Sequence, residues 1–83
     1  MEVAEFIETC KAVFPDCEIT GSRNKKNPCL KAFAYKTRGP YIAHLWKGGC
    51  CSWEKHEDFS QGNIKSPEEL KLKLEKVKLS YGL

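Results

Sequence analysis

The residues of this chain that could carry chemistry gather in its middle part. Between Gly21 and Trp53 the sequence holds seven lysines or arginines and neither aspartate nor glutamate. The segments 1–20 and 54–69 are acidic, so the formal net charge of +3 conceals a strongly basic stretch. Because clustered cations concentrate anions near a protein surface, this asymmetry predicts a polyanionic partner.

Aromatic side chains are interleaved with these cations. The run from Lys31 to Trp46 reads Lys-Ala-Phe-Ala-Tyr-Lys-Thr-Arg-Gly-Pro-Tyr-Ile-Ala-His-Leu-Trp. Cations neutralise phosphates and flat rings stack on bases, so the combination predicts a binding site for nucleic acid or another polyanion. The predicted site residues are Arg23, Lys25, Lys26, Lys31, Phe33, Tyr35, Lys36, Arg38, Trp46 and Lys47.

Cysteine and histidine offer two other kinds of chemistry. Cys50, Cys51 and His56 fall within a short span, but no Cys-x-x-Cys occurs and adjacent cysteines in a strand point to opposite faces. Cys51 with His56, or Cys29 with His44, are conceivable nucleophile and base pairs, although no flanking motif supports either. We therefore predict no metal or other cofactor. A small enzyme that depends on a metal or a cysteine is the third function considered, after nucleic-acid binding and protein interaction.

The bulk composition bounds the class of protein. A chain of 83 residues that is 41% hydrophobic and 30% charged predicts one small globular domain, residues 1–83. No apolar run approaches the roughly 18–20 residues that span a bilayer, and the acidic start is the reverse of a signal peptide. We expect an intracellular, cytoplasmic protein with no membrane partner. Its five cysteines are then expected to behave as small buried hydrophobic residues.

Two amphipathic helices are predicted, one at each end of the chain. In residues 2–14 apolar side chains recur at intervals of three and four, and Pro15 disfavours helical geometry at the residue before it. Ser66, followed by Pro67 and Glu69, has the spacing of a capping box that starts a second helix. The residues expected to form the apolar stripe of this second helix are Leu70, Leu74, Val77 and Tyr81, widened by Leu72 and Leu79.

Strand-like runs rich in aromatic and β-branched residues fill the centre of the chain. Residues 17–20, 29–35 and 41–46 are predicted strands, and residues 50–53 form either a bulged continuation or a fourth strand. Strands joined by short turns pair antiparallel, and two amphipathic helices can bury their apolar faces against one side of such a sheet. The predicted fold class is therefore two-layer α+β, with both helices on one face of a three- or four-stranded antiparallel sheet.

Strand alternation sorts the side chains between the two faces of this sheet. Lys31, Phe33 and Tyr35 are expected on the face without helices, because lysine resists burial. Alternation divides the next strand into two sets, namely Tyr41, Ala43 and Leu45, and Ile42, His44 and Trp46. The hairpin register decides which set is outward. If the second set is outward, its rings join Phe33 and Tyr35 in one aromatic surface.

The order of elements resembles that of the MmcQ/YjbR-like family of small α/β proteins. The comparable stretches are Phe6–Phe14, Lys31–Trp46 and Ile64–Tyr81, and the segment Ile-Lys-Ser-Pro-Glu-Glu-Leu looks like the one that opens the last helix of such domains. The resemblance is one of layout and implies an N-terminal helix, an antiparallel sheet and a C-terminal helix. It also implies a DNA-binding-like or unknown activity, and it carries over no functional residue.

A protein-interaction module is the main alternative function. The acidic N-terminal helix and the basic edge of the sheet could dock onto a protein partner or onto a second copy of the chain. Such a homodimer or complex would bury the same aromatic residues that nucleic acid would otherwise contact.

Overall fold

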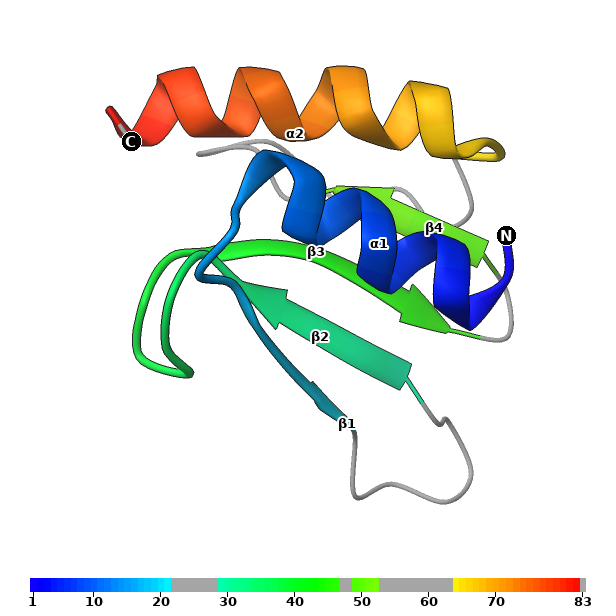
Figure 1. Ribbon diagram of the computed structural model, residues 1–83, viewed down its shortest axis with the longest axis horizontal. Coiled ribbons are helices and arrows are strands. Elements are labelled where there is room, and N and C mark those ends of the chain that lie inside the picture. The colour runs from blue at the N-terminus through cyan, green and yellow to red at the C-terminus, as the bar shows by residue number, and fades with distance from the viewer. Residues whose placement is uncertain (22–28, 47–48, 53–63, 83) are drawn as a thin grey trace.

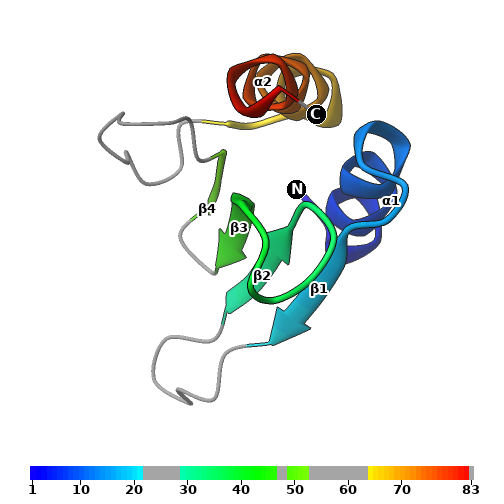
Figure 2. The same cartoon turned by 90° about the vertical axis from the view of Figure 1, so that its left-hand side faces the viewer.

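The computed structural model describes residues 1–21, 29–46, 49–52 and 64–82, without the side chain of Cys51. The elements follow in the order α1 (Val3–Val13), β1 (Glu18–Gly21), β2 (Cys29–Phe33), β3 (Tyr41–Trp46), β4 (Gly49–Ser52) and α2 (Pro67–Tyr81). Consecutive strands pair antiparallel, so the sheet order is β1-β2-β3-β4. Both helices lie on the same side of this sheet (Figures 1 and 2). The predicted two-layer α+β fold is confirmed, with four strands.

The core lies between the two layers and is built from small and medium apolar side chains. Its buried members are Phe6, Cys10, Val13, Phe14, Ala32, Ala34, Ile42, Ala43, Leu45, Cys50, Ile64, Leu70, Leu74 and Val77. Cys10 and Cys50 belong to this core, as expected for cysteines that serve as small hydrophobic residues. Burial raises the pKa of the Cys10 thiol, and the neighbouring Cys17 and Cys50 raise this pKa further.

The ends of the helices follow the local signals in the sequence. Helix α1 ends at Val13, just before the Phe14-Pro15 pair. Helix α2 starts where Ser66 accepts a hydrogen bond of 3.2 Å from the backbone N–H of Glu69, and it ends before Gly82, which has a left-handed φ of 70°. In a complete capping box the carboxylate of Glu69 would also accept a hydrogen bond from the backbone N–H of Ser66. Here it accepts instead from the N–H of Lys65, one residue earlier, at 3.3 Å.

The apolar stripe of α2 is narrower than predicted. Leu70, Leu74 and Val77 are buried, whereas Leu72 and Leu79 are 66% and 81% exposed. Each exposed leucine is two residues, or about 200°, from a buried one, so both lie on the side of the helix opposite the buried stripe. A single helix at the edge of a two-layer domain packs along one line, so residues that far from the line remain in solvent.

Strand β2 is two residues shorter than predicted. It ends at Phe33, and the N–H of Ala34 already donates a bond of 2.8 Å to the carbonyl of Pro40. This bond closes the connection 34–40 between β2 and β3. Tyr35 therefore belongs to the connection and not to the strand.

Candidate nucleic-acid interface

An open groove crosses the face of the sheet that carries no helix, and we call it the outer-face groove. Its volume is about 460 Å³, and its lining residues are Cys29, Lys31, Phe33, Tyr41, His44 and Trp46. The first three come from β2 and the others from β3. They share a face because directly paired residues of antiparallel strands point the same way, and Lys31 pairs with His44 as Cys29 pairs with Trp46. Figure 2 shows this face turned away from α1 and α2.

A register shift at the start of β3 brings Tyr41 into the groove. Ala32 pairs with Ala43, but Phe33 then pairs with Tyr41 instead of Ile42. The irregularity turns Ile42 into the core, where it is fully buried, and leaves Tyr41 beside Phe33 on the outer face. Of the two sets that alternation left open, His44 and Trp46 are the outward one, but the grouping of Ile42 with them and of Tyr41 with the other set was wrong.

The rings in the groove form one continuous row. Phe33 and Tyr41 meet edge to face with centroids 5.5 Å apart and an interplanar angle of 62°. The Tyr41 and His44 centroids lie 5.6 Å apart, and the imidazole of His44 is 3.8 Å from the Trp46 ring centre at an angle of 32°. Phe33, Tyr41 and Trp46 are partly exposed, so solvent and a ligand can reach this row.

His44 occupies the middle of the row and is only 7% exposed. Burial lowers its pKa to about 4, and the nearby ammonium of Lys31 contributes to the lowering. The imidazole is therefore neutral near pH 7. A neutral ring lets Nδ1 accept the hydroxyl hydrogen of Tyr41, and the two side chains are hydrogen-bonded. His44 thus contributes a flat ring to the groove and no positive charge.

The charge of the described outer face is mixed. Lys31 is exposed in the centre of β2, where it pairs with Thr20 of β1 and His44 of β3. Glu18 of β1 pairs with Phe33 and is also exposed, so one carboxylate lies on the same face. In the described part of this face the rings therefore outnumber the cations.

Three further predicted site residues lie in the connection 34–40, beyond the end of the groove. Lys36 and Arg38 are exposed, and Tyr35 is 48% exposed. The Tyr35 ring covers Gly39, where an added Cβ would come within 3.1 Å of the ring carbons. This contact holds Tyr35 against its own turn, so Tyr35 does not line the groove with Phe33 and Trp46.

The remaining predicted cations lie outside the described residues: Arg23, Lys25, Lys26 and Lys47. Cys29, Trp46 and Gly49 are neighbours at one end of the sheet. Lys36 and Arg38 belong to the opposite end, about 15 Å away along the strands. Among the described residues, the predicted cations are therefore Lys31 in the groove and Lys36 and Arg38 at this opposite end.

Of the metal and catalytic arrangements that the sequence left open, the pair Cys29 and His44 is the one that lies wholly within the described residues. Cys50 is buried on the helical side, whereas His44 lies on the outer face. Within residues 1–21, 29–46, 49–52 and 64–82, no cluster of three metal-ligating side chains occurs. Cys29 and His44 do share the groove, but an imidazole with a pKa of about 4 is a weak base at neutral pH. His56 and the side chain of Cys51 lie outside the described part.

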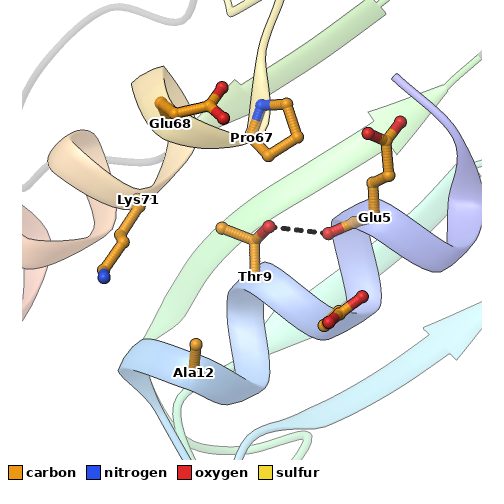
Figure 3. A pocket seen from close by; sticks show the side chains of 7 residues that line it. Glu5, Thr9, Ala12, Pro67, Glu68 and Lys71 are labelled. Carbon is orange, nitrogen blue, oxygen red and sulfur yellow. Dashed lines mark hydrogen bonds between the residues drawn. The ribbon is translucent and has the colours of Figure 1, made fainter.

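A second groove, of about 340 Å³, separates the two helices on the far side of the molecule (Figure 3). Glu5, Glu8 and Glu68 stand around it with a single cation, Lys71, while Thr9 bonds back to the carbonyl of Glu5 at 2.7 Å. A groove with this excess of carboxylates repels phosphates. A polyanion is therefore expected on the outer face and not between the helices.

Comparison with protein-family models, curated proteins and solved structures found no match for this chain. The resemblance to the MmcQ/YjbR-like proteins accordingly stays a prediction. Among the described helices, none has the length and apolar character needed to cross a bilayer. The cytoplasmic location also stays a prediction.

Proposed function

We propose that this protein is a small nucleic-acid-binding domain that uses the outer-face groove. The observation that carries the proposal is the row of rings from Phe33 to Trp46 on a sheet face that neither helix covers. A contiguous apolar surface that solvent can reach often marks a binding site. Bases offer flat faces of the matching size, and each base stacked on a ring contributes about 1–3 kcal/mol.

The basic residues support the same ligand class. Lys31 lies inside the groove, and Lys36 and Arg38 are exposed at one end of the sheet. Phosphates that follow a base across the groove would meet these cations in turn. Arg23, Lys25, Lys26 and Lys47 lie outside the described residues and belong to the proposed interface on the charge pattern of the sequence alone.

Titration of the full chain with fluorescein-labelled DNA and RNA oligonucleotides tests the proposal. We expect anisotropy to rise at about 50 mM salt and the affinity to fall at about 200 mM, because phosphate contacts release counterions. The variant Lys31→Gln should bind more weakly than the wild type at the lower salt concentration. Undetectable binding of every oligonucleotide at low salt would end the proposal.

A protein partner is the second candidate, and a different surface favours it. Leu72 and Leu79 are exposed on α2 and, with the stems of Lys73 and Lys76, line a shallow groove. Exposed leucines seven residues apart form the kind of stripe that another helix can cover. Sedimentation of the wild type and of the double variant Leu72→Gln, Leu79→Gln would reveal a self-complex, because only the wild type would associate.

A further inference from the structure

The described groove is lined by several aromatic rings and few charged groups. This composition helps to distinguish whether single-stranded or duplex nucleic acid binds there. Lys31 is the single cation among its six lining residues, and Glu18 lies on the same face one strand away. Within the described groove, phosphate contacts alone would therefore give little affinity. Most of the binding free energy contributed by the groove itself would come from the rings.

Resting on the proposed function, we infer that the outer-face groove takes unpaired nucleotides and holds them by the faces of their bases. In a duplex each base is stacked on its neighbours and shows only its edges in the grooves. A ring can reach the face of a base only when that base is unpaired and turned out of its stack. The ligand class is therefore a single strand, or an unpaired loop or end, and not a regular duplex.

The geometry of the groove agrees with a ligand of this kind. The sheet positions the rings through backbone pairing, since Phe33 pairs with Tyr41 and Lys31 with His44. Successive ring centroids are 3.8 to 5.6 Å apart in tilted or edge-to-face pairs, so each ring is in contact with the next. The rings thus form a fixed platform rather than a set of independent side chains. Lys31 stands beside this platform, where it can contact the phosphate of a stacked nucleotide.

The experiment compares three labelled ligands of equal length with the full chain: a single strand of about ten nucleotides, the same strand with abasic sites at its centre, and the corresponding duplex. Abasic sites keep the phosphates and remove the rings that would stack. We expect the abasic strand and the duplex each to bind at least about tenfold more weakly than the intact strand.

Equal affinity for the intact and abasic strands, or tighter binding of the duplex, would overturn the inference while leaving nucleic-acid binding intact. Failure of all three ligands to bind would instead refute the proposed function.

Variants of the protein provide the complementary test. Trp46→Leu should weaken the intact strand about tenfold and leave the weak affinity for the abasic strand unchanged, because the variant removes a stacking ring without removing charge. Phe33→Leu should act in the same direction, and it keeps the inference testable if Trp46→Leu does not fold. Val3→Ala, on the exposed side of α1, is the matched control and should bind as the wild type does. An equal loss for intact and abasic strands in both groove variants would contradict the inference.

Discussion

The ammonium of Lys78 donates a hydrogen bond of 3.0 Å to the carbonyl oxygen of Val13, the last residue of α1. The same ammonium lies 5.8 Å from the centre of the Phe14 ring. Carbonyls at the end of a helix lack intrahelical partners and carry partial negative charge, so a cation is favourable there. A residue of α2 thereby completes the C-terminal end of α1 and joins the two helices over the core.

Replacing Lys78 should consequently destabilise the fold. Lys78→Met keeps most of the side-chain length but removes the charge and the donor, and we expect a loss of about 1–2 kcal/mol in the free energy of unfolding. Urea denaturation followed by circular dichroism measures this loss. Lys76→Met, at an exposed position of the same helix, is the control and should stay within about 0.5 kcal/mol of the wild type. Equal stabilities for the two variants would contradict the role of Lys78.

The buried imidazole of His44 should make the stability depend on pH. In the unfolded chain the group takes up a proton near its ordinary pKa of 6.5, whereas in the fold burial lowers the pKa to about 4. The unfolded state therefore binds more protons between these two values, and the protein loses stability as the pH falls from about 6.5 to 4. Above pH 6.5 this contribution is constant. The expected total loss is roughly 1–3 kcal/mol.

Urea denaturation at several pH values between 4 and 8 measures this dependence. The variant His44→Gln has no titrating group at this position, so its stability should fall less over the same range. Carboxylates begin to titrate near pH 4 in both proteins, and the difference between the two curves isolates His44. Parallel curves for wild type and variant would contradict the assignment.

The local signals in the sequence were sufficient to predict where the two helices begin and end. Pro15 stops α1, and Ser66 and Gly82 bound α2, because each acts through backbone geometry within one turn. The faces of α2 were harder to predict. Whether Leu72 is buried depends on how many neighbours surround the helix, and a helical pattern does not contain that information.

The candidate site was predictable in part. Lys31 and Phe33 line the groove, as the alternation of strand residues predicted, and Trp46 joins them through a hairpin register that the sequence left open. Tyr41 was assigned to the wrong set because a register shift after Ala32 leaves no mark in composition or spacing. The prediction that Tyr35 lies beside Phe33 was wrong, because Tyr35 belongs to the turn after β2, where its ring packs over Gly39.

Thiol reactivity should divide the described cysteines into two classes. Cys10 and Cys50 are 0% and 1% exposed, and burial raises the pKa of Cys10, so neither is expected to react while the protein is folded. Cys29 lines the groove and should react. In a titration with a disulfide reagent near pH 8, Cys29→Ser should remove one rapidly reacting thiol, whereas Cys10→Ser should change only the total found after denaturation. Rapid loss of the Cys10 thiol in the native protein would contradict the packing of this core.

Opposite charges on the outer face should change binding in opposite directions. Glu18 lies opposite Phe33 and repels phosphates, whereas Lys31 attracts them from within the groove. We expect Glu18→Gln to tighten the binding of a single-stranded oligonucleotide and Lys31→Gln to weaken it, each by about two- to fivefold at low salt. Both effects should shrink as salt is added, because the two positions are exposed.

Glu8→Gln, which makes the same change of charge on α1, should leave the affinity unaltered. If Glu8→Gln and Glu18→Gln tighten binding equally, the effect belongs to net charge and the outer face is not the binding surface.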